Sequence, residues 1–558
     1  MNDVSSGIPG VLPYLDSADA AIRKSLLWIK QQCSDGGAVS NDRLDAHQMA
    51  SFDLAWCAAE ATAARFAAEY AGRVAASLPP GSSACLEERM ARAFCAEALQ
   101  NILNRLRARP QSFGLGEADL AALASPDVTR FCQGELDAAG LEALGREIIA
   151  QDGASGAYLL GDDETMMQDA FRKLATNVVM PLAEEIHRED RIIPKEILGP
   201  LTEMGCFGLS IPQRYGGMQS DDHEDNMGMI VVTEELSRGS LGGAGSLITR
   251  PEILSRSLLK GGTEEQRTKW LPQVAMGDPL CAVAVTEPDA GSDVAAMRLK
   301  ATKCDGGWIL DGAKTWCTMA GKAGVLLVLA RSNPDSSLGH RGLSMFLVEK
   351  DSYEGHDFEY RQPQGGVITG RAIATIGYRG MHSYEVFFDH VFVPDENLVG
   401  GPQGEGKGFY FTMAGFAGGR IQTAARAIGV MQAAFEKAVS YAQERKAFGK
   451  PIGEFQLTRV KLARMATLLT VSRQFTYAVG RLMDRGQGQM EASMVKLFTC
   501  RTAEWLTREA MQIHGGMGYA EETSVSRYFL DARVLSIFEG AEETLALKVI
   551  ARSLLDGV

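Results

Sequence analysis

The hydrophobic pattern of the chain changes twice, and these changes limit the folds that it can adopt. Apolar residues recur at helical spacing up to about residue 280, and again from Gly408 to the end. Between them, residues 281–402 carry short β-rich runs split by Gly, Asp, Asn and Pro, which is typical of an antiparallel sheet or barrel. We therefore expect a mainly α fold with a β middle domain.

The 558 residues are enough for several domains, and two features mark their borders. The segment 152–163 is rich in Gly and Asp and predicts a linker, while long helical runs after Gly408 predict a bundle of antiparallel helices. We expect four parts: a helical N-terminal extension (1–160), a helical domain (161–280), a β domain (281–402) and a C-terminal helical bundle (403–558).

Four local predictions refine this outline. Thr263 with Gln266 has the pattern of a capping box that opens a helix. Pro181 predicts a kink or a break within a helical stretch. Gly312–Thr318 is expected just after a strand, and the glycine-rich stretch 361–380 is expected to be a surface loop. The first long helix of the bundle is expected over residues 421–445.

Composition and net charge limit the possible binding partners and the cellular compartment of the protein. The net charge is −14 and the sequence has no long basic run, which argues against nucleic acid as a partner. The start, MNDVSSGIPG, lacks the features of a secretory signal, and no apolar run approaches the length of a membrane span. The ten cysteines form no CxxC pair, which indicates buried thiols in a reducing cytoplasm and no metal site.

Glu539 is a candidate catalytic base. It lies in Ser536–Gly540 (SIFEG), after two apolar residues and before a glycine. Apolar neighbours desolvate a carboxylate and disfavour its charged form, which makes it a better base. A surface glutamate at the end of a strand or helix would have the same sequence, so the assignment depends on motifs upstream.

Four such motifs precede Glu539 in the chain. They are Val285–Asp293 (VTEPDAGSD), Lys314–Thr318 (KTWCT), Arg445–Ile452 (RKAFGKPI) and Gln512–Gly516 (QIHGG). In this order and spacing they resemble the acyl-CoA dehydrogenase family of flavoenzymes, over about residues 163–558. The resemblance implies an FAD cofactor, an acyl-CoA thioester substrate and electron-transferring flavoprotein as the electron acceptor.

The resemblance also implies which residues bind FAD. They are Val283, Val285, Thr286, Gly291, Ser292, Trp316, Thr318, Arg445, Phe448, Gln456, Gln512, Gly515, Gly516, Ala541 and Glu543. In the family a neighbouring subunit supplies the contacts that match Arg445, Phe448, Gln456, Gln512 and Gly516. A homo-oligomer, either a dimer or a tetramer, is therefore expected. Two positions depart from the family pattern: Ala541 replaces a common Thr and Glu543 replaces a common Gln.

For the chemistry, the resemblance implies that Glu539 removes the α-proton of the thioester while a β-hydride passes to the flavin. Some members carry the base one residue before an arginine on the long helix, but Gly419 occupies that position here, followed by Arg420. Ser292, Arg420 and Gly540 are expected near the substrate.

The extension and the overall length are similar to those of members that oxidise (2S)-methylsuccinyl-CoA to mesaconyl-CoA. Such a substrate carries a second carboxylate, and desolvating this charge requires a cation or several donors in the pocket. Arg250 and Thr249 lie near the position where the family's acyl pocket ends and are the candidates; a surface ion pair for Arg250 is the competing interpretation.

Three other functions fit the same resemblance. The chain could oxidise a different short-chain acyl-CoA, or it could be a flavin oxidase or monooxygenase that passes electrons to O2. A non-catalytic nucleic-acid-binding relative is a further alternative, against which Glu539 and the acidic charge both argue. The extension could also be a partner-docking module.

Overall fold

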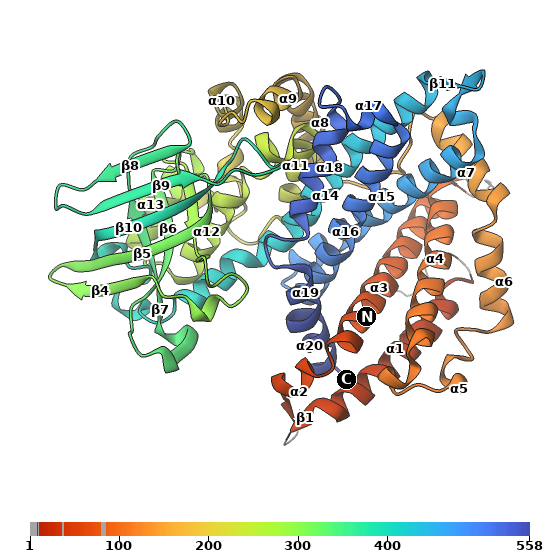
Figure 1. Cartoon of the computed structure of the whole chain (residues 1–558), viewed down its shortest axis with the longest axis horizontal. Helices are drawn as coiled ribbons and strands as arrows, with labels where there is room; N and C mark the ends of the chain where they lie inside the picture. The colour runs from red at the N-terminus through yellow and green to blue at the C-terminus, as the bar shows by residue number, and fades with distance from the viewer. Residues whose placement is uncertain (1–7, 9, 36–37, 80–84) are drawn as a thin grey trace. The chain divides into compact units, whose positions relative to one another are not determined.

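Figure 1 shows the computed structural model of the chain, which describes residues 8, 10–35, 38–79 and 85–558. Residues 1–7, on which the expectation of no secretory signal partly rests, lie outside the described residues. Within the described part of the chain, no helix combines the length and apolar character needed to cross a membrane.

The chain forms two compact units, which we name by their main content. The sheet unit contains residues 162–422, and the bundle unit contains residues 1–161 together with 423–558. The fold is helical with a β-sheet in the middle of the chain, as the sequence predicts. The N-terminal extension packs with the C-terminal helices in one unit.

Within residues 281–394, all of which are described, eight strands form one sheet in the order β3-β6-β4-β5-β10-β9-β8, with β7 paired to β6. Most neighbours are antiparallel, as expected, but β6 runs parallel to both β3 and β4. The strands are β3 (Cys281–Ala284), β4 (Lys300–Cys304), β5 (Gly307–Thr318), β6 (Val325–Arg331), β7 (Leu343–Glu349), β8 (Asp357–Arg361), β9 (Val367–Ala372) and β10 (Ser383–Pro394).

The two faces of this sheet are buried in two different hydrophobic clusters. Ala282 and Ala284 of β3 join one cluster, while the alternate residues Cys281 and Val283 join the other. Successive side chains of a strand point to opposite faces, so a strand that is apolar throughout is covered on both sides. This explains why β3 and β6 are continuous apolar runs in the sequence.

Two expectations for the sheet are wrong. Gly312–Thr318 does not follow a strand but forms the second half of β5, which pairs with β10 along its length. The stretch 361–380 is not all loop, because Val367–Ala372 forms β9. One of the glycines that suggested a loop is required by the sheet, since a Cβ on Gly370 would lie 2.1 Å from the Phe358 ring of β8.

Most helices of the sheet unit precede the sheet in the chain. They are α8 (Asp162–Leu174), the π-helical turn η2 (Ala175–Val179), α9 (Met180–Arg188), α10 (Lys195–Glu203), α11 (Asn226–Gly239), the π-helical turn η5 (Leu241–Gly245), α12 (Thr249–Gly261) and α13 (Glu264–Ala275). The capping box of α13 is confirmed, with Thr263 and Gln266 bonding each other's backbone N–H groups. The helical stretch does not break at Pro181. The π-helical turn η2 lies directly between α8 and α9, and Pro181 is in the first turn of α9.

The long helix α14 (Gly408–Glu444) begins in the sheet unit and ends in the bundle unit. It therefore starts 13 residues before the predicted residue 421 (421 − 408 = 13). The missed turns contain Gly415, Gly418 and Gly419, which lower helix propensity. Packing requires at least one of them, since a Cβ on Gly418 would lie 2.0 Å from the Glu252 carboxylate.

In the bundle unit, the extension packs directly on the C-terminal helices. Helices α3 and α4 lie against α15, and α3 also contacts α16 (Figure 1). The main helices of this unit are α1 (Leu12–Cys33), α3 (Gln48–Ser77), α4 (Leu86–Ala108), α6 (Pro126–Glu135), α7 (Ala138–Ala150), α15 (Gln456–Met483), α16 (Gln489–Ile513), α17 (Gly516–Tyr519) and α18 (Ser524–Leu535).

Small residues permit this close packing. Many alanines of α3 are fully buried, among them Ala59, Ala63 and Ala64. At the contact of α7 with α15, a Cβ on Gly145 would lie 2.0 Å from the Arg459 carbonyl oxygen, so only glycine fits there. The Ala-rich composition of the extension thus matches helices that approach one another closely.

Candidate active site

The end of β3 supplies backbone groups that are expected at the flavin. Val283 and Val285 are buried, and Thr286 at the strand end is partly exposed. The Thr286 carbonyl oxygen accepts a hydrogen bond of 2.9 Å from the Thr315 N–H. This bond joins the VTEPDAGSD motif to the KTWCT motif on β5, so the two motifs lie side by side as the family resemblance implies.

A buried lysine holds the two motifs together. Lys314 Nζ donates to the Val285 carbonyl oxygen at 2.8 Å and to the Glu287 carboxylate at 2.9 Å. The same carboxylate accepts the N–H groups of Arg298 and Leu299, which closes the loop between them. Complete burial lowers the pKa of Lys314, while Glu287 opposes that effect. The pair fixes the backbone beside Thr286.

Trp316 and Thr318 lie on β5 and not after a strand as predicted. The Trp316 side chain is 53% exposed and its backbone has a φ of 57°, in the left-handed region that tryptophan rarely adopts. Thr318 is buried, and its hydroxyl lies 2.9 Å from the Ser383 hydroxyl of β10. A strained, exposed tryptophan within a strand is typical of a ligand-binding position.

The loop after Glu287 carries the other predicted contacts of this unit. Gly291 and Ser292 are exposed, and a Cβ on Gly291 would meet only the Thr286 methyl group, at 4.0 Å. Backbone groups in this loop are therefore accessible to a ligand beside Thr286.

Arg250 and Thr249, at the start of α12, are both buried, with Arg250 7% exposed. The alternative interpretation of Arg250 as a surface ion pair is therefore wrong. Burial raises the pKa values of the nearby Cys281 and Cys317 thiols to about 12, and the Arg250 guanidinium opposes this rise, together with Lys314 at Cys317. Arg250 lines a cavity of about 10 Å³ together with Phe207, Leu247, Cys281 and Met319, which is room for one water molecule. Arg420 lies partly exposed on α14.

In the bundle unit, Glu539 follows α18 and is partly exposed. Its φ is 54°, and Gly540 after it has a φ of 97°. Two successive left-handed residues turn the chain sharply, and for glutamate this conformation costs free energy. The turn that Gly540 completes follows the end of α18 and positions Glu539.

Buried cations surround this turn. Lys496 of α16 is 1% exposed, and its Nζ donates to the Gly540 carbonyl oxygen at 2.6 Å. The Arg426 guanidinium lies 4.9 Å from the centre of the Phe538 ring. Both residues next to Glu539 are therefore held by side chains of other helices.

The two positions that depart from the family pattern follow this turn. Ala541 precedes the short helix α19 (Glu542–Thr544), and its carbonyl oxygen accepts the Leu545 N–H at 2.9 Å. Glu542 turns inward and pairs with Arg501, whereas Glu543 is exposed.

The RKAFGKPI motif forms a hairpin of β11 (Lys446–Ala447) and β12 (Lys450–Pro451). Phe448 and Gly449 form its two-residue turn, with φ values of 51° and 84°, as in a type I′ turn. The Phe448 side chain is 96% exposed, and Arg445 beside the hairpin is also exposed. An exposed phenylalanine in a strained turn fits a contact with a partner or a ligand.

The QIHGG motif lies at the same end of the bundle. The His514 ring stacks on Tyr441 with 4.3 Å between ring centres, which links the end of α16 to the end of α14 just before Arg445. Gln512, Gly515 and Gly516 are exposed. A Cβ on either glycine would meet nothing within 4 Å, so their backbone faces open space.

The side-chain amide of Gln456, a predicted FAD contact, is hydrogen-bonded to a residue of the N-terminal extension. Gln456 Nε2 donates to the Glu142 carboxylate at 3.1 Å, and Arg459 Nη1 donates to the same group at 2.8 Å. These bonds lower the pKa of Glu142, with Arg459 the largest cause. The extension thus reaches a predicted cofactor residue.

The residues present fit an FAD. The sheet unit presents an exposed indole, a hydroxyl pair at Thr318 and accessible backbone beside Thr286, while the bundle unit presents Arg445 and Phe448 to solvent. These are the aromatic, polar and cationic groups that a flavin and its diphosphate require.

Comparison with known families gives the class of the protein. The models of the acyl-CoA dehydrogenase N-terminal, middle and C-terminal domains match residues 161–278, 282–391 and 406–555. The chain belongs to the acyl-CoA dehydrogenase family. It is an FAD-dependent oxidoreductase acting on CH–CH donors.

Individual relatives refine this assignment. The chain is 40% identical, over 568 aligned residues, to (2S)-methylsuccinyl-CoA dehydrogenase of Cereibacter sphaeroides, with 100% of this chain and 99% of that protein covered. Among solved structures it is similar to butyryl-CoA dehydrogenase from Megasphaera elsdenii, with a TM-score of 0.65, 31% identity, and coverage of 72% of this chain and 100% of that one. It is also similar to a glutaryl-CoA dehydrogenase from Mycobacterium smegmatis in complex with FADH2, with a TM-score of 0.62, 27% identity, and coverage of 71% and 95%.

The sequence did not reveal three residues that support the site. Lys314 lies inside a recognised motif, but no pattern indicates that it bonds Val285 and Glu287. Ser383 and Lys496 carry no local signal at all, because their partners Thr318 and Gly540 lie 65 and 44 residues away.

Proposed function

We propose that this chain oxidises (2S)-methylsuccinyl-CoA to mesaconyl-CoA. The observation that carries the proposal is the 40% identity to (2S)-methylsuccinyl-CoA dehydrogenase along both whole chains. The alignment includes the extension, which the shorter butyryl-CoA dehydrogenase chain leaves uncovered. This chain therefore shares the extension with a relative that acts on methylsuccinyl-CoA.

Glu539 is the proposed base. Its carboxylate takes the α-proton of the thioester, which the thioester carbonyl makes acidic. Bound FAD supplies the acceptor for the hydride that leaves the β-carbon, so the substrate loses two electrons and two hydrogens and gains a carbon–carbon double bond. The left-handed turn at Glu539–Gly540 and the Lys496 bond to Gly540 support a fixed position for this carboxylate.

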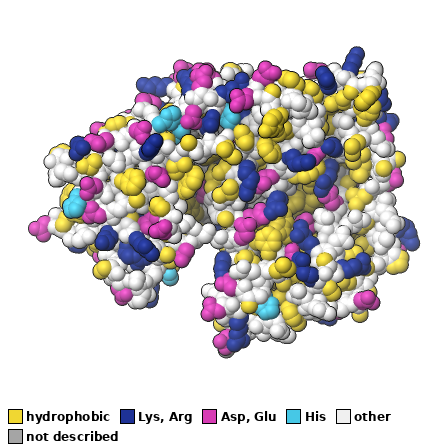
Figure 2. Space-filling model, in the orientation of Figure 1, with side chains coloured by type: hydrophobic (Ala, Val, Ile, Leu, Met, Phe, Trp, Pro, Cys, Tyr) yellow, Lys and Arg dark blue, Asp and Glu magenta, His cyan; other side chains and the backbone are white. Residues whose placement is uncertain are grey.

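Several further properties belong to the same proposal. Electron-transferring flavoprotein takes the electrons, the enzyme acts in the cytoplasm, and the reaction belongs to the ethylmalonyl-CoA pathway. A homo-oligomer places Arg445 and Phe448 of one subunit at the FAD of the next. Their exposure in the single chain supports this arrangement. On the face drawn in Figure 2, Lys and Arg side chains are interspersed with Asp and Glu, which gives nucleic acid no uniform basic surface there.

Arg250 and Thr249 are the proposed partners of the distal carboxylate. The cavity of about 10 Å³ beside Arg250 is too small for an acyl chain, so direct contact requires it to widen when substrate binds. Arg250→Met should raise the KM for methylsuccinyl-CoA at least tenfold, and Arg250→Lys, which keeps the charge, should raise it less. An unchanged KM in Arg250→Met would remove Arg250 from the proposal.

The test of the proposed function is an anaerobic titration of the FAD-containing protein with acyl-CoA thioesters. Rapid bleaching of the flavin absorbance by methylsuccinyl-CoA, and not by butyryl-CoA or isobutyryl-CoA, is the expected result. Bleaching by the monocarboxylic thioesters alone would contradict the substrate. Fast reoxidation when air is admitted to the reduced, product-bound enzyme would identify an oxidase.

A further inference from the structure

We infer that the sheet unit binds a zinc-class transition-metal ion between Asp190, His356 and His382. This site goes beyond the proposed function and does not depend on it. The expectation of no metal site rested on the cysteine pattern, which says nothing about imidazole and carboxylate ligands.

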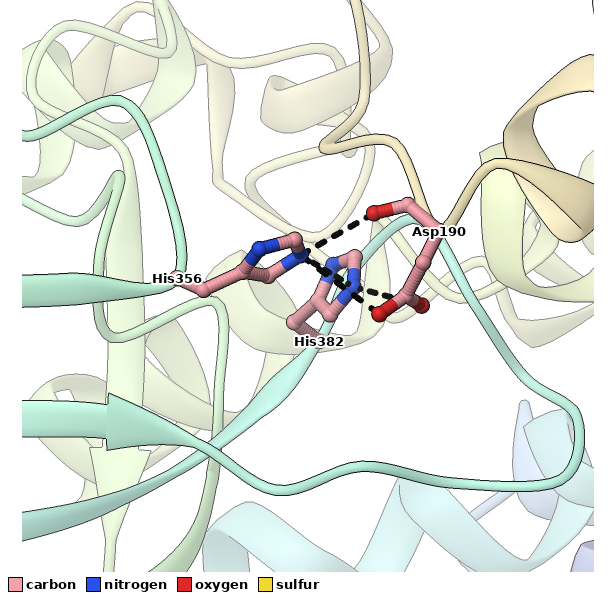
Figure 3. Close-up of side chains that lie close together, drawn as sticks. All are labelled: Asp190, His356 and His382. Atoms are coloured by element: carbon pink, nitrogen blue, oxygen red, sulfur yellow. Dashed lines mark hydrogen bonds and ion pairs between the residues drawn. The ribbon is translucent and has the colours of Figure 1, made fainter.

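The three side chains converge from distant parts of the chain (Figure 3). Asp190 follows α9, His356 precedes β8, and His382 precedes β10. The two Nε2 atoms lie 3.1 Å apart, and the Asp190 carboxylate lies 3.1 Å from His382 Nε2 and 3.6 Å from His356 Nε2. Ligand atoms around a tetrahedral zinc ion are about 3.3 Å apart, given Zn–N distances of about 2.0–2.1 Å. The cluster thus already has the spacing of three such ligands.

The hydrogen bonds around the cluster select the right tautomer at His382. Its Nδ1 lies 3.0 Å from the Gly380 carbonyl oxygen, which can only accept, so Nδ1 carries the proton and Nε2 offers its lone pair to the cluster. Metal-ligating histidines are commonly oriented by such a bond from the other ring nitrogen. The Asp190 carbonyl oxygen, 3.0 Å from His356 Nε2, also accepts, so without an ion His356 Nε2 carries a proton, which moves to Nδ1 when the ring binds the metal.

Burial suits a bound cation, whereas one nearby charge opposes it. The His382 side chain is 3% exposed, whereas the side chains of His356 and Asp190 are 45% and 38% exposed, which leaves an entry path. The positive group that faces the cluster is Arg379, whose Nε lies 3.4 Å from the Asp190 carboxylate. Arg379 also donates to the Thr375 and His187 carbonyl oxygens, which hold it beside the cluster.

The ion would tie three segments of the sheet unit together beside the flavin motif. The Met319 N–H donates to the His382 carbonyl oxygen at 2.9 Å, and the next residue, Ser383, bonds the Thr318 hydroxyl. An ion at His382 would therefore stiffen the end of β5 that carries Thr318. Its proposed role is structural, because binding of an ion to the folded state alone stabilises that state.

The chain offers a matched control. Asp311, Asp389 and His390 form a second group of possible ligands, in which the His390 side chain is 78% exposed and its Nδ1 lies 3.0 Å from Asp311. This second group has one imidazole and no buried member. It should bind zinc weakly.

The experiment uses the full-length FAD-containing protein after treatment with a chelator. Zinc sulfate is added in excess, free ion is removed by gel filtration, and zinc per chain is measured by mass spectrometry. We expect about one zinc per chain in the wild type and in His390→Gln, and almost none in His356→Gln. Zinc should also raise the Tm of the first two proteins by a few degrees and leave the Tm of His356→Gln unchanged.

His356 is half exposed, so His356→Gln should fold, and its Tm without zinc checks this. Equal zinc content in the wild type and His356→Gln would overturn the site. Loss of zinc in His390→Gln alone would assign the ion to the surface group and would equally overturn it. A wild type that retains no zinc would also overturn it.

Discussion

Each unit fixes a motif with a buried lysine, but the two lysines do so differently. Lys314 of the sheet unit bonds the Val285 carbonyl oxygen and the Glu287 carboxylate, so it links two motifs through an ion pair. Lys496 of the bundle unit bonds the carbonyl oxygen of Gly540, directly after the proposed base. Burying an ammonium group is costly, and both are placed where the backbone of a site must be held. We infer that Lys314 serves the fold of the cofactor motif, and Lys496 the position of the base.

The largest effect should come from Lys314→Met. Glu287 would lose its buried partner, and breaking a buried ion pair costs about 3–5 kcal/mol. The free energy of unfolding, measured with urea, should fall by that amount, and FAD should be retained poorly.

Lys303→Met is the control for this change. Lys303 and Asp395 are both 53% exposed, and an exposed pair contributes about 0–1 kcal/mol. If Lys314→Met were no more destabilising than Lys303→Met, the ion pair would not hold the motifs.

Lys496→Met should lower activity more than it lowers FAD content. A hydrogen bond from a charged group is worth about 1.5–3 kcal/mol, so the turn at Glu539 should loosen and kcat should fall about 10- to 100-fold. The KM should change little.

Lys548→Met is the matched change at a surface pair, where Lys548 lies 2.6 Å from Asp45. Its kcat should equal that of the wild type. Loss of FAD in step with kcat in Lys496→Met would assign Lys496 to the fold instead of the base.

Lys350 is a third buried lysine, and it lies outside the proposed site. Its substitution therefore measures the effect of burying a lysine without any effect on a site. Lys350 donates to the Gly321 and Asp351 carbonyl oxygens, and burial lowers its pKa from 10.5 to about 7. Between these pH values the unfolded chain still holds the proton that the folded chain has released, so this group makes stability rise with pH by about 1.4 kcal/mol per pH unit. Lys350→Met should remove this slope in urea unfolding at pH 7, 8 and 9, with FAD retained. An unaltered slope would show that Lys350 stays charged in the folded state.

The smallest effect on the fold should come from Phe448→Ala. Phe448 is 96% exposed, so the free energy of unfolding of the FAD-free chain should change by less than about 0.5 kcal/mol. If Phe448 contacts the FAD of a neighbouring subunit, FAD affinity should fall about tenfold, as equilibrium dialysis would show. Tyr519→Ala, at an aromatic residue that is 83% exposed, should leave the affinity unchanged.

The order of helical and β parts could be predicted because apolar residues have a different spacing in helices and in strands, and this spacing is visible in the sequence. Strand β9 was missed because Gly370, which suggested a loop, is needed for contact with Phe358. The start of α14 was missed because its glycines meet packing needs that only the folded structure reveals.

The site was predictable only where residues cluster in motifs. Trp316, Phe448 and Glu539 all have left-handed backbones, which no propensity indicates, yet each lies in a recognised motif. The bond of Lys496 to Gly540 and the cluster of Asp190 with His356 and His382 come from tertiary structure, so the sequence carried no local sign of them.

The most direct test of the account is the rate of flavin bleaching in Glu539→Gln. Anaerobic stopped-flow mixing with methylsuccinyl-CoA should show bleaching about 10²- to 10⁴-fold slower than in the wild type, because the base that takes the α-proton is gone. FAD content should be unchanged, and Glu521→Gln, at an exposed glutamate, should bleach at the wild-type rate. Wild-type bleaching in FAD-loaded Glu539→Gln would contradict the assignment of Glu539 as the base.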